Sequence, residues 1–573
     1  MTKTAKHPGG LYVLFFTEMW ERFGYYLMLG IFSLYMLDNW DNGGMGFAAA
    51  KKSDIYGTYL GLVYLTPFIG GLLADRLLGY RRSIFIGGSL MALGYFGLSI
   101  HDTTAFYVSL LLIILGNGFF KPNISTLVGN LYNDDRYKMN KDAGYNIFYM
   151  GINIGAFICN FLAAFMRINY GWNLAFMLAG CGMVLGLIIF AAGTSKVRSA
   201  DVRKPTQPGD LPLWKIFATV ILPMFLFGLV GYFINGITSA TNPDGNIFGT
   251  DTNDAFLIGC VPVIFFFLYM WFKANKEDKG PIGALLSVYA CLVIFWAVFH
   301  QNGDALTVWA KDYSNREMPA FISGAAEKVN MAQVTEYDAS VNYDAATFAA
   351  YIDSLKAVKN ATTDEAAAKE MGEMIALRER SHDYFKNLPE NKRPEKGSEL
   401  LLVSTEIYQS VNPFWVIVFT PLVVGIWSFL RKRKKEPTTP TKIAIGLLIT
   451  ALSALVMVGA VKSVNIDNDK ASIFWLYGTY TVVTIGELCL SPMGLSLVSK
   501  LSPPRLTALM MGGFFLSTSV GNKFAGILSG MWEKYEDKSN FFLTNTLLAL
   551  AASVMMFILL RWLNRVMREK NIQ

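Results

Sequence analysis

Charged residues are scarce in this sequence. Only 16% of its 573 residues are Asp, Glu, Lys or Arg, and 53% are hydrophobic, whereas an average soluble domain carries roughly 25% charged residues. A soluble chain of this length would form about four domains, each with a charged surface that this composition cannot supply. The composition therefore excludes a disordered, fibrous or ordinary cytosolic protein and predicts an all-α membrane protein with many spans.

Cysteine is also scarce, and the pattern of its five copies excludes some chemistry. All five fall within hydrophobic runs, where they are expected to be small buried side chains and not disulfides or metal ligands. The sequence has no Cys/His metal spacing, Walker loop or nucleophile elbow, which argues against an enzyme, an ATP-driven pump and a bound metal or cofactor. The first hydrophobic run follows Thr2 to Gly10 directly, without the features of a cleavable signal.

Hydrophobic runs near the 20 residues needed to cross a bilayer occur fourteen times. They lie near 11–37, 54–74, 83–100, 105–128, 143–166, 173–193, 213–237, 254–272, 282–309, 412–430, 442–461, 471–498, 507–532 and 541–560. The layout predicts a six-helix bundle (1–196), a linker with a two-helix hairpin (197–280), and a second bundle formed by 281–309 and 412–573. Residues 310–411 form a polar insert within this second bundle.

The placement of Lys and Arg predicts the orientation. With both termini in the cytoplasm, the inner loops hold 27 Lys/Arg and the short outer loops hold seven, the bias expected of a correct assignment. The insert is then outside the cytoplasm and is acidic, with 12 Lys/Arg against 17 Asp/Glu. The net charge of +7 therefore comes mainly from Lys and Arg in the inner loops, where they set the orientation. Nucleic acid is for this reason not an expected partner. The insert is interpreted as a lid or spacer, or alternatively as a domain that captures substrate or binds a partner.

Few ionisable residues remain at the depth of the membrane, where a charge costs about 2.5–3.5 kcal/mol on insertion scales and marks a functional candidate. They are Glu18, Glu21, Arg22, Lys121, His300, Asp304, Glu487 and Lys523. Glu18, Glu21 and Arg22 share one helix face, which Tyr25 continues. One of these two carboxylates is expected to carry a proton, although the cluster could also be a static salt bridge that packs two helices.

Two proline-interrupted segments occupy the same position in the two bundles. Lys121 precedes Pro122 in the fourth run, and Glu487 lies four residues before Ser491-Pro492 in the fourth run of the second bundle. Interrupted helices in matching positions indicate a site at the midplane, and a substrate with one amine and one carboxylate would fit between these charges.

Three further charged residues keep two interpretations each. His300 suits a proton relay or a hydrogen-bonded core position. Asp304 could pair with His300 or face an outer vestibule, and Lys523 is a packing or gate residue.

Several motifs together resemble the proton-coupled oligopeptide transporter family. Residues 18–26 (EMWERFGYY) resemble the family's first-helix ExxERFxYY motif, and residues 148–156 (FYMGINIGA) resemble its fifth-helix FYxxINxGS motif. Residues 70–82 (GGLLADRLLGYRR) resemble the signature loop of the major facilitator fold. The resemblance implies that fold and the proton-driven uptake of di- and tripeptides.

The resemblance also implies roles for individual residues. The Glu18, Glu21 and Arg22 group couples protonation to movement together with Lys121, while His300 is a further candidate on the proton route. Peptide-binding positions are matched by Tyr25, Tyr26, Tyr64, Lys121, Asn153, Glu487, Ser491 and Phe514, and Asp304 and Lys523 are gate candidates. Protons are the expected coupling ion, no cofactor is expected, and the protein is expected to act as a monomer in a bacterial cytoplasmic membrane.

Three positions depart from the family pattern. Leu29 stands where many members have an arginine, His300 replaces an acidic residue, and Phe514 replaces a tryptophan. These departures leave the substrate preference and the outer gate open. The alternative functions are symport of another small anion such as nitrate, against which Glu487 argues, and a peptide sensor that does not transport.

Overall fold

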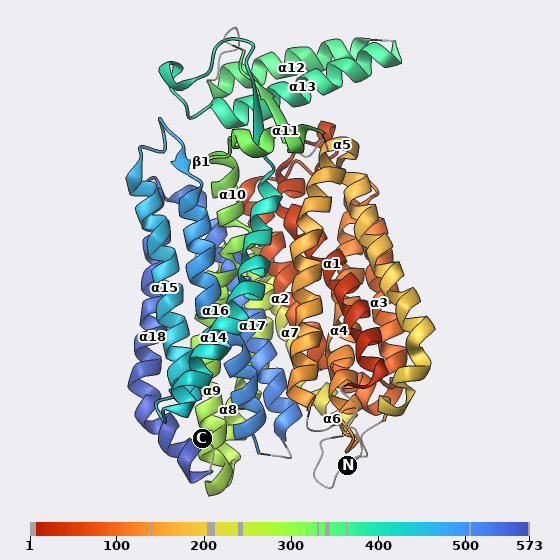
Figure 1. The fold of residues 1–573 in the computed structure, drawn as a ribbon, viewed down its shortest axis with the longest axis vertical. Helices are drawn as coiled ribbons and strands as arrows, with labels where there is room; N and C mark the ends of the chain where they lie inside the picture. The colour runs from red at the N-terminus through yellow and green to blue at the C-terminus, as the bar shows by residue number, and fades with distance from the viewer. Residues whose placement is uncertain are drawn as a thin grey trace.

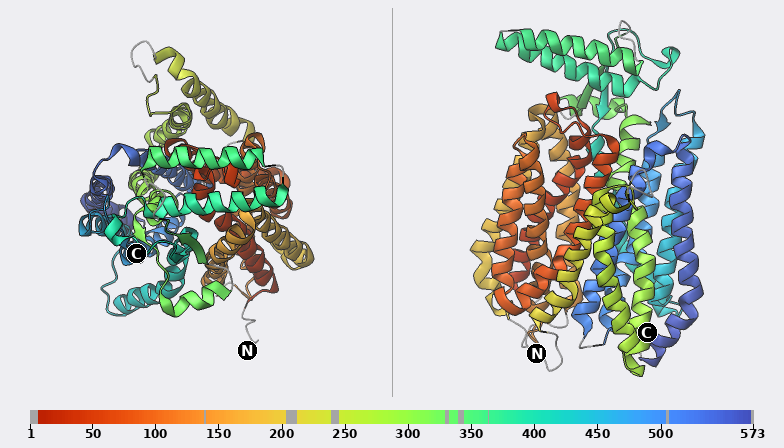
Figure 2. Two further views of the ribbon diagram at one scale, coloured as in Figure 1. Left: turned by 90° about the horizontal axis from the view of Figure 1, so that it is seen from above. Right: turned by 180° about the vertical axis from the view of Figure 1, so that it is seen from behind.

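The computed structural model describes residues 7–137, 140–202, 212–238, 245–328, 332–338, 344–362, 364–503 and 506–570. Long helices run side by side through the molecule, and two shorter helices lie across one end (Figures 1 and 2). The first helices form the N-terminal half: α1 (Gly9–Leu37), α2 (Ala49–Leu73), α3 (Tyr80–Leu98), α4 (Thr103–Leu131) and α5 (Lys141–Val197).

The second half follows a hairpin. The hairpin consists of α6 (Leu213–Ile216), which runs through a π-helical turn into α7 (Leu222–Thr238), and of α8 (Asp251–Lys273). The C-terminal half consists of α9 (Lys276–Phe299), α10 (Ala305–Asp312), α14 (Val411–Lys432), α15 (Thr439–Ser463), α16 (Phe474–Leu501), α17 (Thr507–Gly530) and α18 (Lys538–Glu569).

The insert forms a small unit over one end of the helices (Figure 1). Its elements are β1 (Ser314–Asn315), α11 (Ala320–Lys328), β2 (Ala332–Glu336), α12 (Ala345–Ala361), α13 (Glu365–Phe385) and β3 (Glu399–Val403). β2 pairs antiparallel with β3, and β1 pairs parallel with β4 (Ala471–Ser472), which precedes α16. We call this end of the molecule the insert side; α1 begins and α18 ends at the opposite side.

The predicted hydrophobic runs lie largely in helices, but several boundaries differ. The run predicted at 282–309 covers α9, a 3₁₀ turn and part of α10, and the run predicted at 471–498 begins in β4. The runs at 143–166 and 173–193 belong to α5, which continues through Gly171, a residue whose φ of 83° divides it into two helices. The run predicted to begin at 54 belongs to α2, which begins five residues earlier and so includes Lys52. Most of the linker predicted before the hairpin lies outside the described residues. So do some of the Lys and Arg residues counted in the inner loops: Lys3, Lys6, Lys138, Arg203, Lys204 and Arg505.

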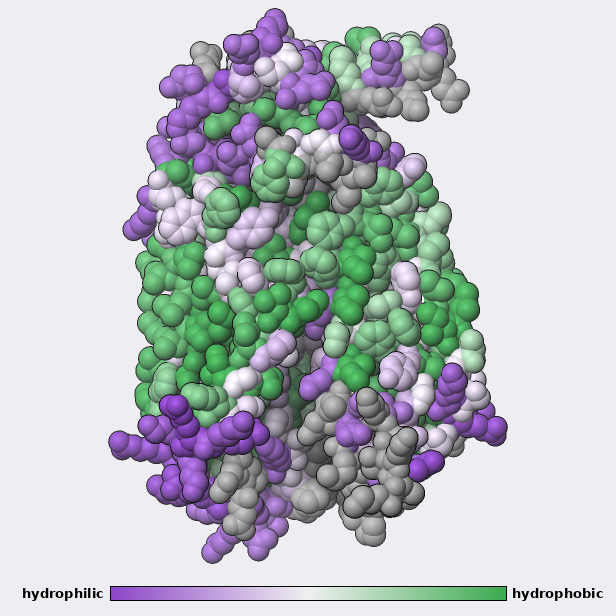
Figure 3. Space-filling view, in the orientation of Figure 1, coloured by the Kyte–Doolittle hydropathy of each residue, from purple (hydrophilic) through white to green (hydrophobic). Residues whose placement is uncertain are grey.

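The helices carry a hydrophobic surface suited to lipid. Within the described part of the chain, ten helical segments are long and apolar enough to cross a membrane, and the space-filling view shows a broad apolar band between two polar ends (Figure 3). α1 is not among the ten, and it carries three charged residues in its middle. The structure is therefore that of an all-helical membrane protein.

Each half has its own apolar core, and the halves meet along α2 and α17. One cluster of buried residues includes side chains from all of the helices α1 to α5. Another includes side chains from α9 and from α15 to α18. At the crossing of α2 and α17, a Cβ atom built on Gly57 would lie 2.7 Å from the Cα atom of Gly526. Only glycine permits this approach, so the two backbones are in direct contact.

Candidate functional site

A compact charged cluster lies in the middle of α1. The Nε atom of Arg22 lies 3.2 Å from a carboxylate oxygen of Glu18, and its terminal nitrogen donates a 2.6 Å hydrogen bond to Glu21. The exposed fractions are 2%, 0% and 3% for Glu18, Glu21 and Arg22. Their spacing of three and four residues places these groups on one helix face, and the Arg22 guanidinium also lies 5.0 Å from the centre of the Tyr25 ring. Two carboxylates therefore share one buried cation.

Lys121 on α4 adds a second cation beside this cluster. It interacts electrostatically with both Glu18 and Glu21, and its ammonium lies 4.0 Å from the centre of the Tyr64 ring on α2. Tyr64 also contacts His300, with 6.2 Å between the ring centres. Tyr64 thus links the cation of the N-terminal half to a residue of the C-terminal half.

His300 lies where α9 ends and a 3₁₀ turn begins. Its Nδ1 atom lies 3.3 Å from the backbone oxygen of Trp296, and its ring packs beside the Trp296 ring with 5.3 Å between centres. Asp304 does not pair with it in this structure: its carboxylate pairs with Lys52. The structure therefore does not show the pairing of Asp304 with His300, which was one of its two interpretations.

Glu487 lies in the middle of α16 and faces α14 and α1. The side-chain amide of Asn412 donates hydrogen bonds to Glu487 (3.0 Å) and to the hydroxyl of Thr484 (2.8 Å). Tyr26 on α1 interacts electrostatically with Glu487. One helical turn after Glu487, the hydroxyl of Ser491 is buried and has no hydrogen-bond partner among the described residues. Asn412 therefore belongs to this site, although a neutral side chain at the start of a hydrophobic run carries no signal that could have predicted it.

Three remaining candidates differ in their surroundings. The amide of Asn153 on α5 donates a 2.9 Å hydrogen bond to the backbone of Tyr149, one turn earlier. Phe514 is 4% exposed and packs in the core of the C-terminal half, with its ring 6.4 Å from that of Tyr289. Leu29 is buried within the N-terminal half. Phe514 thus packs within the apolar core of the C-terminal half.

The two gate candidates each form an ion pair with α2. Asp304 pairs with Lys52, and both are almost fully buried. Lys523 on α17 lies 2.7 Å from Asp54. A third buried pair, which sequence reasoning missed, joins Arg167 on α5 to Glu406 before α14, at 2.7 Å. These pairs all join the two halves on the insert side.

The opposite side has fewer polar ties between the halves. The cross-half contacts of Ser33, Lys52, Arg167, Gln409 and Lys523 lie on the insert side, and that of Ser519 with the Gly61 backbone is farther from the insert. Below that contact, polar side chains are visible in a furrow between the halves (Figure 3). The polar contacts described here that join the two halves therefore lie mostly on the insert side.

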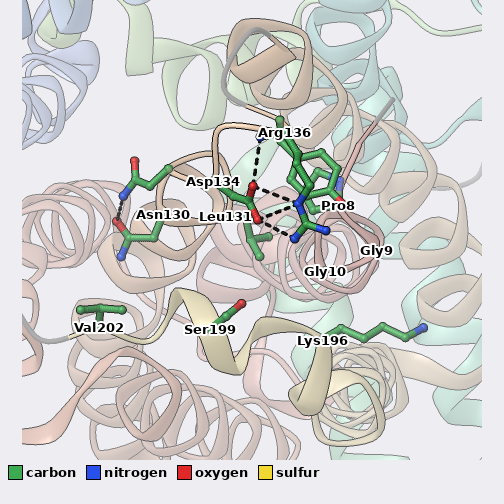
Figure 4. Close-up of a pocket in the computed structure, with 12 residues that line it drawn as sticks. Pro8, Gly9, Gly10, Asn130, Leu131, Asp134, Arg136, Lys196, Ser199 and Val202 are labelled. Atoms are coloured by element: carbon green, nitrogen blue, oxygen red, sulfur yellow. Dashed lines mark hydrogen bonds and ion pairs between the residues drawn. The ribbon is translucent and has the colours of Figure 1, made fainter. Parts of the chain in front are cut away.

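A polar pocket of about 690 Å³ lies elsewhere, at the side opposite the insert (Figure 4). It is bounded by the start of α1 and the ends of α4 and α5, and its lining includes Asn130, Lys196 and the 2.6 Å ion pair of Asp134 with Arg136. None of the predicted site residues lines this pocket, so the candidate site is the charged region between the two halves.

Two helical halves that face each other across buried opposite charges define a membrane transporter and not an enzyme. Comparison with known proteins agrees. The model of the POT family matches residues 81–330 and 397–545, which is more than half of the chain. The chain belongs to the POT family. The family match omits residues 331–396, which contain β2, α12 and α13.

Relatives and solved structures cover nearly the whole chain. A di-/tripeptide transporter of Lactococcus lactis subsp. cremoris is 28% identical over 99% of this chain and 99% of its own. An uncharacterized transporter, YclF, of Bacillus subtilis is 29% identical over 93% of this chain and 90% of its own. A crystal structure of a peptide transporter POT in complex with sulfate is 28% identical, covers 98% of this chain and 96% of its own, and has a TM-score of 0.72.

Proposed function

We propose that the protein takes up di- and tripeptides by proton-coupled alternating access. The observation that carries this proposal is the division of charge between the halves. Lys121 and Arg22 lie in the N-terminal half, and Glu487 with Asn412 lies in the C-terminal half. A short peptide has a carboxylate at one end and an ammonium at the other, so it can bridge the two halves. The two ends of a longer peptide would be too far apart to reach both charged groups.

In this proposal each end of the peptide meets a group of opposite charge. The peptide carboxylate binds Lys121 and Arg22, and the peptide ammonium binds Glu487, which Asn412 holds by a 3.0 Å hydrogen bond. Tyr25, Tyr26, Tyr64, Asn153 and Ser491 complete the binding surface. Related proteins support this assignment, since the Lactococcus lactis relative is named a di-/tripeptide transporter and a POT structure contains alafosfalin.

Proton coupling is assigned to the cluster of Glu18, Glu21 and Arg22 with Lys121. When both carboxylates are charged, one Arg and one Lys are shared between them and the peptide. Protonation of one carboxylate frees a cation for the peptide carboxylate, so proton and peptide bind together. His300, adjacent to Tyr64, is a second candidate on the proton route. No cofactor is needed for this cycle.

The membrane arrangement follows from the same proposal. Fourteen helical segments cross a bacterial cytoplasmic membrane, counting the two parts of α5 separately, with both termini in the cytoplasm and the insert outside. The excess of Lys and Arg at the side opposite the insert supports this orientation. The substrate path lies within a single chain, between its two halves, and the functional unit is a monomer.

Uptake of labelled dialanine into proteoliposomes tests the proposal. We expect accumulation driven by an inward proton gradient and competition by di- and tripeptides but not by tetrapeptides. Uptake that persists after both the pH and voltage gradients are collapsed, with no peptide gradient, would contradict the coupling. Competition by nitrate in place of peptides would indicate an anion symporter, and binding without counterflow would indicate a sensor.

The role of His300 is tested by the pH profile of uptake. We expect His300→Ala to change the dependence of uptake on external pH, because the imidazole lies beside Tyr64 and Lys121. A profile that matches the unmodified protein would remove His300 from the proton route while leaving the proposal for the α1 cluster intact.

A further inference from the structure

Two successive turns of α13 contact the two halves of the molecule. Glu379 accepts hydrogen bonds from Asn39 (2.9 Å) and Asn42 (2.7 Å), which lie in the connection between α1 and α2. Four residues later, Asp383 lies 2.7 Å from Lys311 at the end of α10. Successive turns of one helix therefore reach the N-terminal half and the C-terminal half, as expected from the position of α12 and α13 across the insert side (Figure 2).

The contact with the N-terminal half is polar. Lys356 on α12 lies 3.2 Å from both Asp41 and Glu379, so it bridges the connection between α1 and α2 to the insert. The apolar cluster of the insert, which includes Phe348, Ile352 and Phe385, contains no residue of the N-terminal half. The Asp41 side chain is 54% exposed and Lys356 is 22% exposed. Water can therefore replace these partners when the surfaces separate.

The contact with the C-terminal half is more extensive. β1 pairs with β4 before α16, and the Lys470 ammonium donates to the backbone oxygen of Asp312 and lies 5.0 Å from the Tyr384 ring. Lys392 pairs with Asp469 in the same loop. The chain also enters and leaves the insert through α10 and α14. The insert is thus joined to the C-terminal half by paired backbone and is continuous with it at both ends, while its exit at Ser404 and Glu406 also bonds Arg167 of the N-terminal half.

We propose that Lys356 and Glu379 form a latch on the connection between α1 and α2, engaged when the insert side is closed and released when it opens. The latch rests on the proposed alternating access, in which the two halves rotate relative to each other. A contact made in only one state shifts the equilibrium toward that state. Partly exposed ion pairs are weak and are screened by salt, so the latch favours closure by a few fold without locking it.

The first test measures opening of the insert side without any substrate. Ser33 is 1% exposed and donates a 2.8 Å hydrogen bond to the Gly303 backbone across the halves, so a cysteine there reacts only when this side opens. Its labelling by a membrane-impermeant maleimide is followed in Ser33→Cys/Cys181→Ser proteoliposomes; the other four native cysteines are buried.

The double variant Lys356→Met/Glu379→Gln should label about three- to tenfold faster than the parent at low salt. High salt should accelerate the parent but not this variant. The control variant Asp353→Asn/Glu370→Gln changes exposed charges of the same two helices and should behave as the parent does. Equal labelling rates and equal salt responses in all three proteins would overturn the latch.

A second test fixes the latch in place. Cysteines at Asn42→Cys and Glu379→Cys, joined by a short reducible thiosulfonate crosslinker, should stop dialanine uptake until a reductant is added. The control pair Lys392→Cys and Asp469→Cys lies within one rigid body and should leave uptake unchanged when joined. Full uptake by the joined 42–379 protein would overturn the latch. Absence of uptake in every protein would instead contradict the proposed function, and the labelling result would still decide the latch.

Discussion

The ammonium of Lys121 lies 4.0 Å from the centre of the Tyr64 ring. Both residues belong to the N-terminal half, but the Tyr64 ring also contacts His300 of the C-terminal half. The ring therefore holds the cation that we assign to the peptide carboxylate, and it does so at the boundary between the halves. This arrangement gives Tyr64 a role that depends on its ring and not on its hydroxyl.

Replacement of Tyr64 tests this role. A cation–π contact contributes about 0.5–2 kcal/mol, so Tyr64→Leu should weaken dialanine binding by about 2- to 30-fold, whereas Tyr64→Phe should retain binding. The measurement is competition against labelled dialanine at constant pH. A dipeptide amide, which lacks the carboxylate, should compete equally in both variants. If Phe and Leu weaken binding to the same extent, the hydroxyl is the important group.

Glu487 should discriminate peptides by their amino terminus. A hydrogen bond to a charged group contributes about 1.5–3 kcal/mol, and we expect Glu487→Gln to weaken dialanine binding by about 10- to 100-fold. Asn412→Ala should have a smaller effect in the same direction, because Asn412 only holds the carboxylate. N-acetyl-dialanine, which has no ammonium, serves as the control ligand. An undiminished affinity for dialanine in Glu487→Gln would exclude the assigned role.

The buried pair of Lys52 and Asp304 should favour closure of the insert side. Asp304→Asn leaves a lysine that is 2% exposed without its carboxylate, and breaking one partner of a buried pair costs about 3–5 kcal/mol. That cost is relieved when the insert side opens to water. We therefore expect faster labelling of Ser33→Cys in Asp304→Asn, and partial reversal when Lys52→Met is added.

The matched control for the buried pair is Asp467→Asn, which removes an exposed carboxylate on the same side of the molecule. It should label at the parent rate. Identical rates for Asp304→Asn and this control would mean that the buried pair does not distinguish the open and closed states.

Lys470 should make stability depend on pH above neutrality. Burial lowers the pKa of Lys470 to about 7, while the unfolded chain keeps a lysine pKa near 10.4. Between these values the unfolded state binds a proton that the folded state lacks, so stability rises with pH through this window, by at most about 1.4 kcal/mol per pH unit. Below pH 7 both states are protonated and this dependence disappears.

Thermal unfolding of purified protein from pH 6 to pH 9 checks this prediction. The difference in unfolding temperature between the parent and Lys470→Met should change with pH above 7, in favour of the parent at the alkaline end. Lys470→Arg keeps a permanent charge and should stay destabilised throughout. If the unfolding temperatures of all three proteins change with pH in the same way, Lys470 titrates normally in the folded state.

The sequence predicted the helices and the central charges because both follow from the cost of polar groups in lipid. Glu18, Glu21, Arg22, Lys121 and Glu487 stand out among apolar neighbours, and any such group requires a partner or a function. The helix boundaries were less accurate where a helix extends past the apolar run. The three residues before the predicted start of α2 are polar, although α2 includes them.

The partners of the gate residues could not be predicted. Lys52 and Arg167 were assigned to loops by their charge, yet each is buried against a carboxylate more than 230 residues away in sequence. Only the packing of the two halves brings these groups together. Asn412 was missed for a different reason: a neutral amide carries no large burial cost, so its position gives no signal until Glu487 is seen beside it.

The contact between Gly57 and Gly526 sets how far each end of α2 travels. Gly57 lies eight residues from the insert-side end of α2 and sixteen from the other end, which correspond to about 12 Å and 24 Å of helix at 1.5 Å per residue. If the halves rotate about this backbone contact, the two ends of α2 lie at unequal distances from the centre of rotation. A small separation at the insert side then corresponds to about twice that movement at the opposite end of α2.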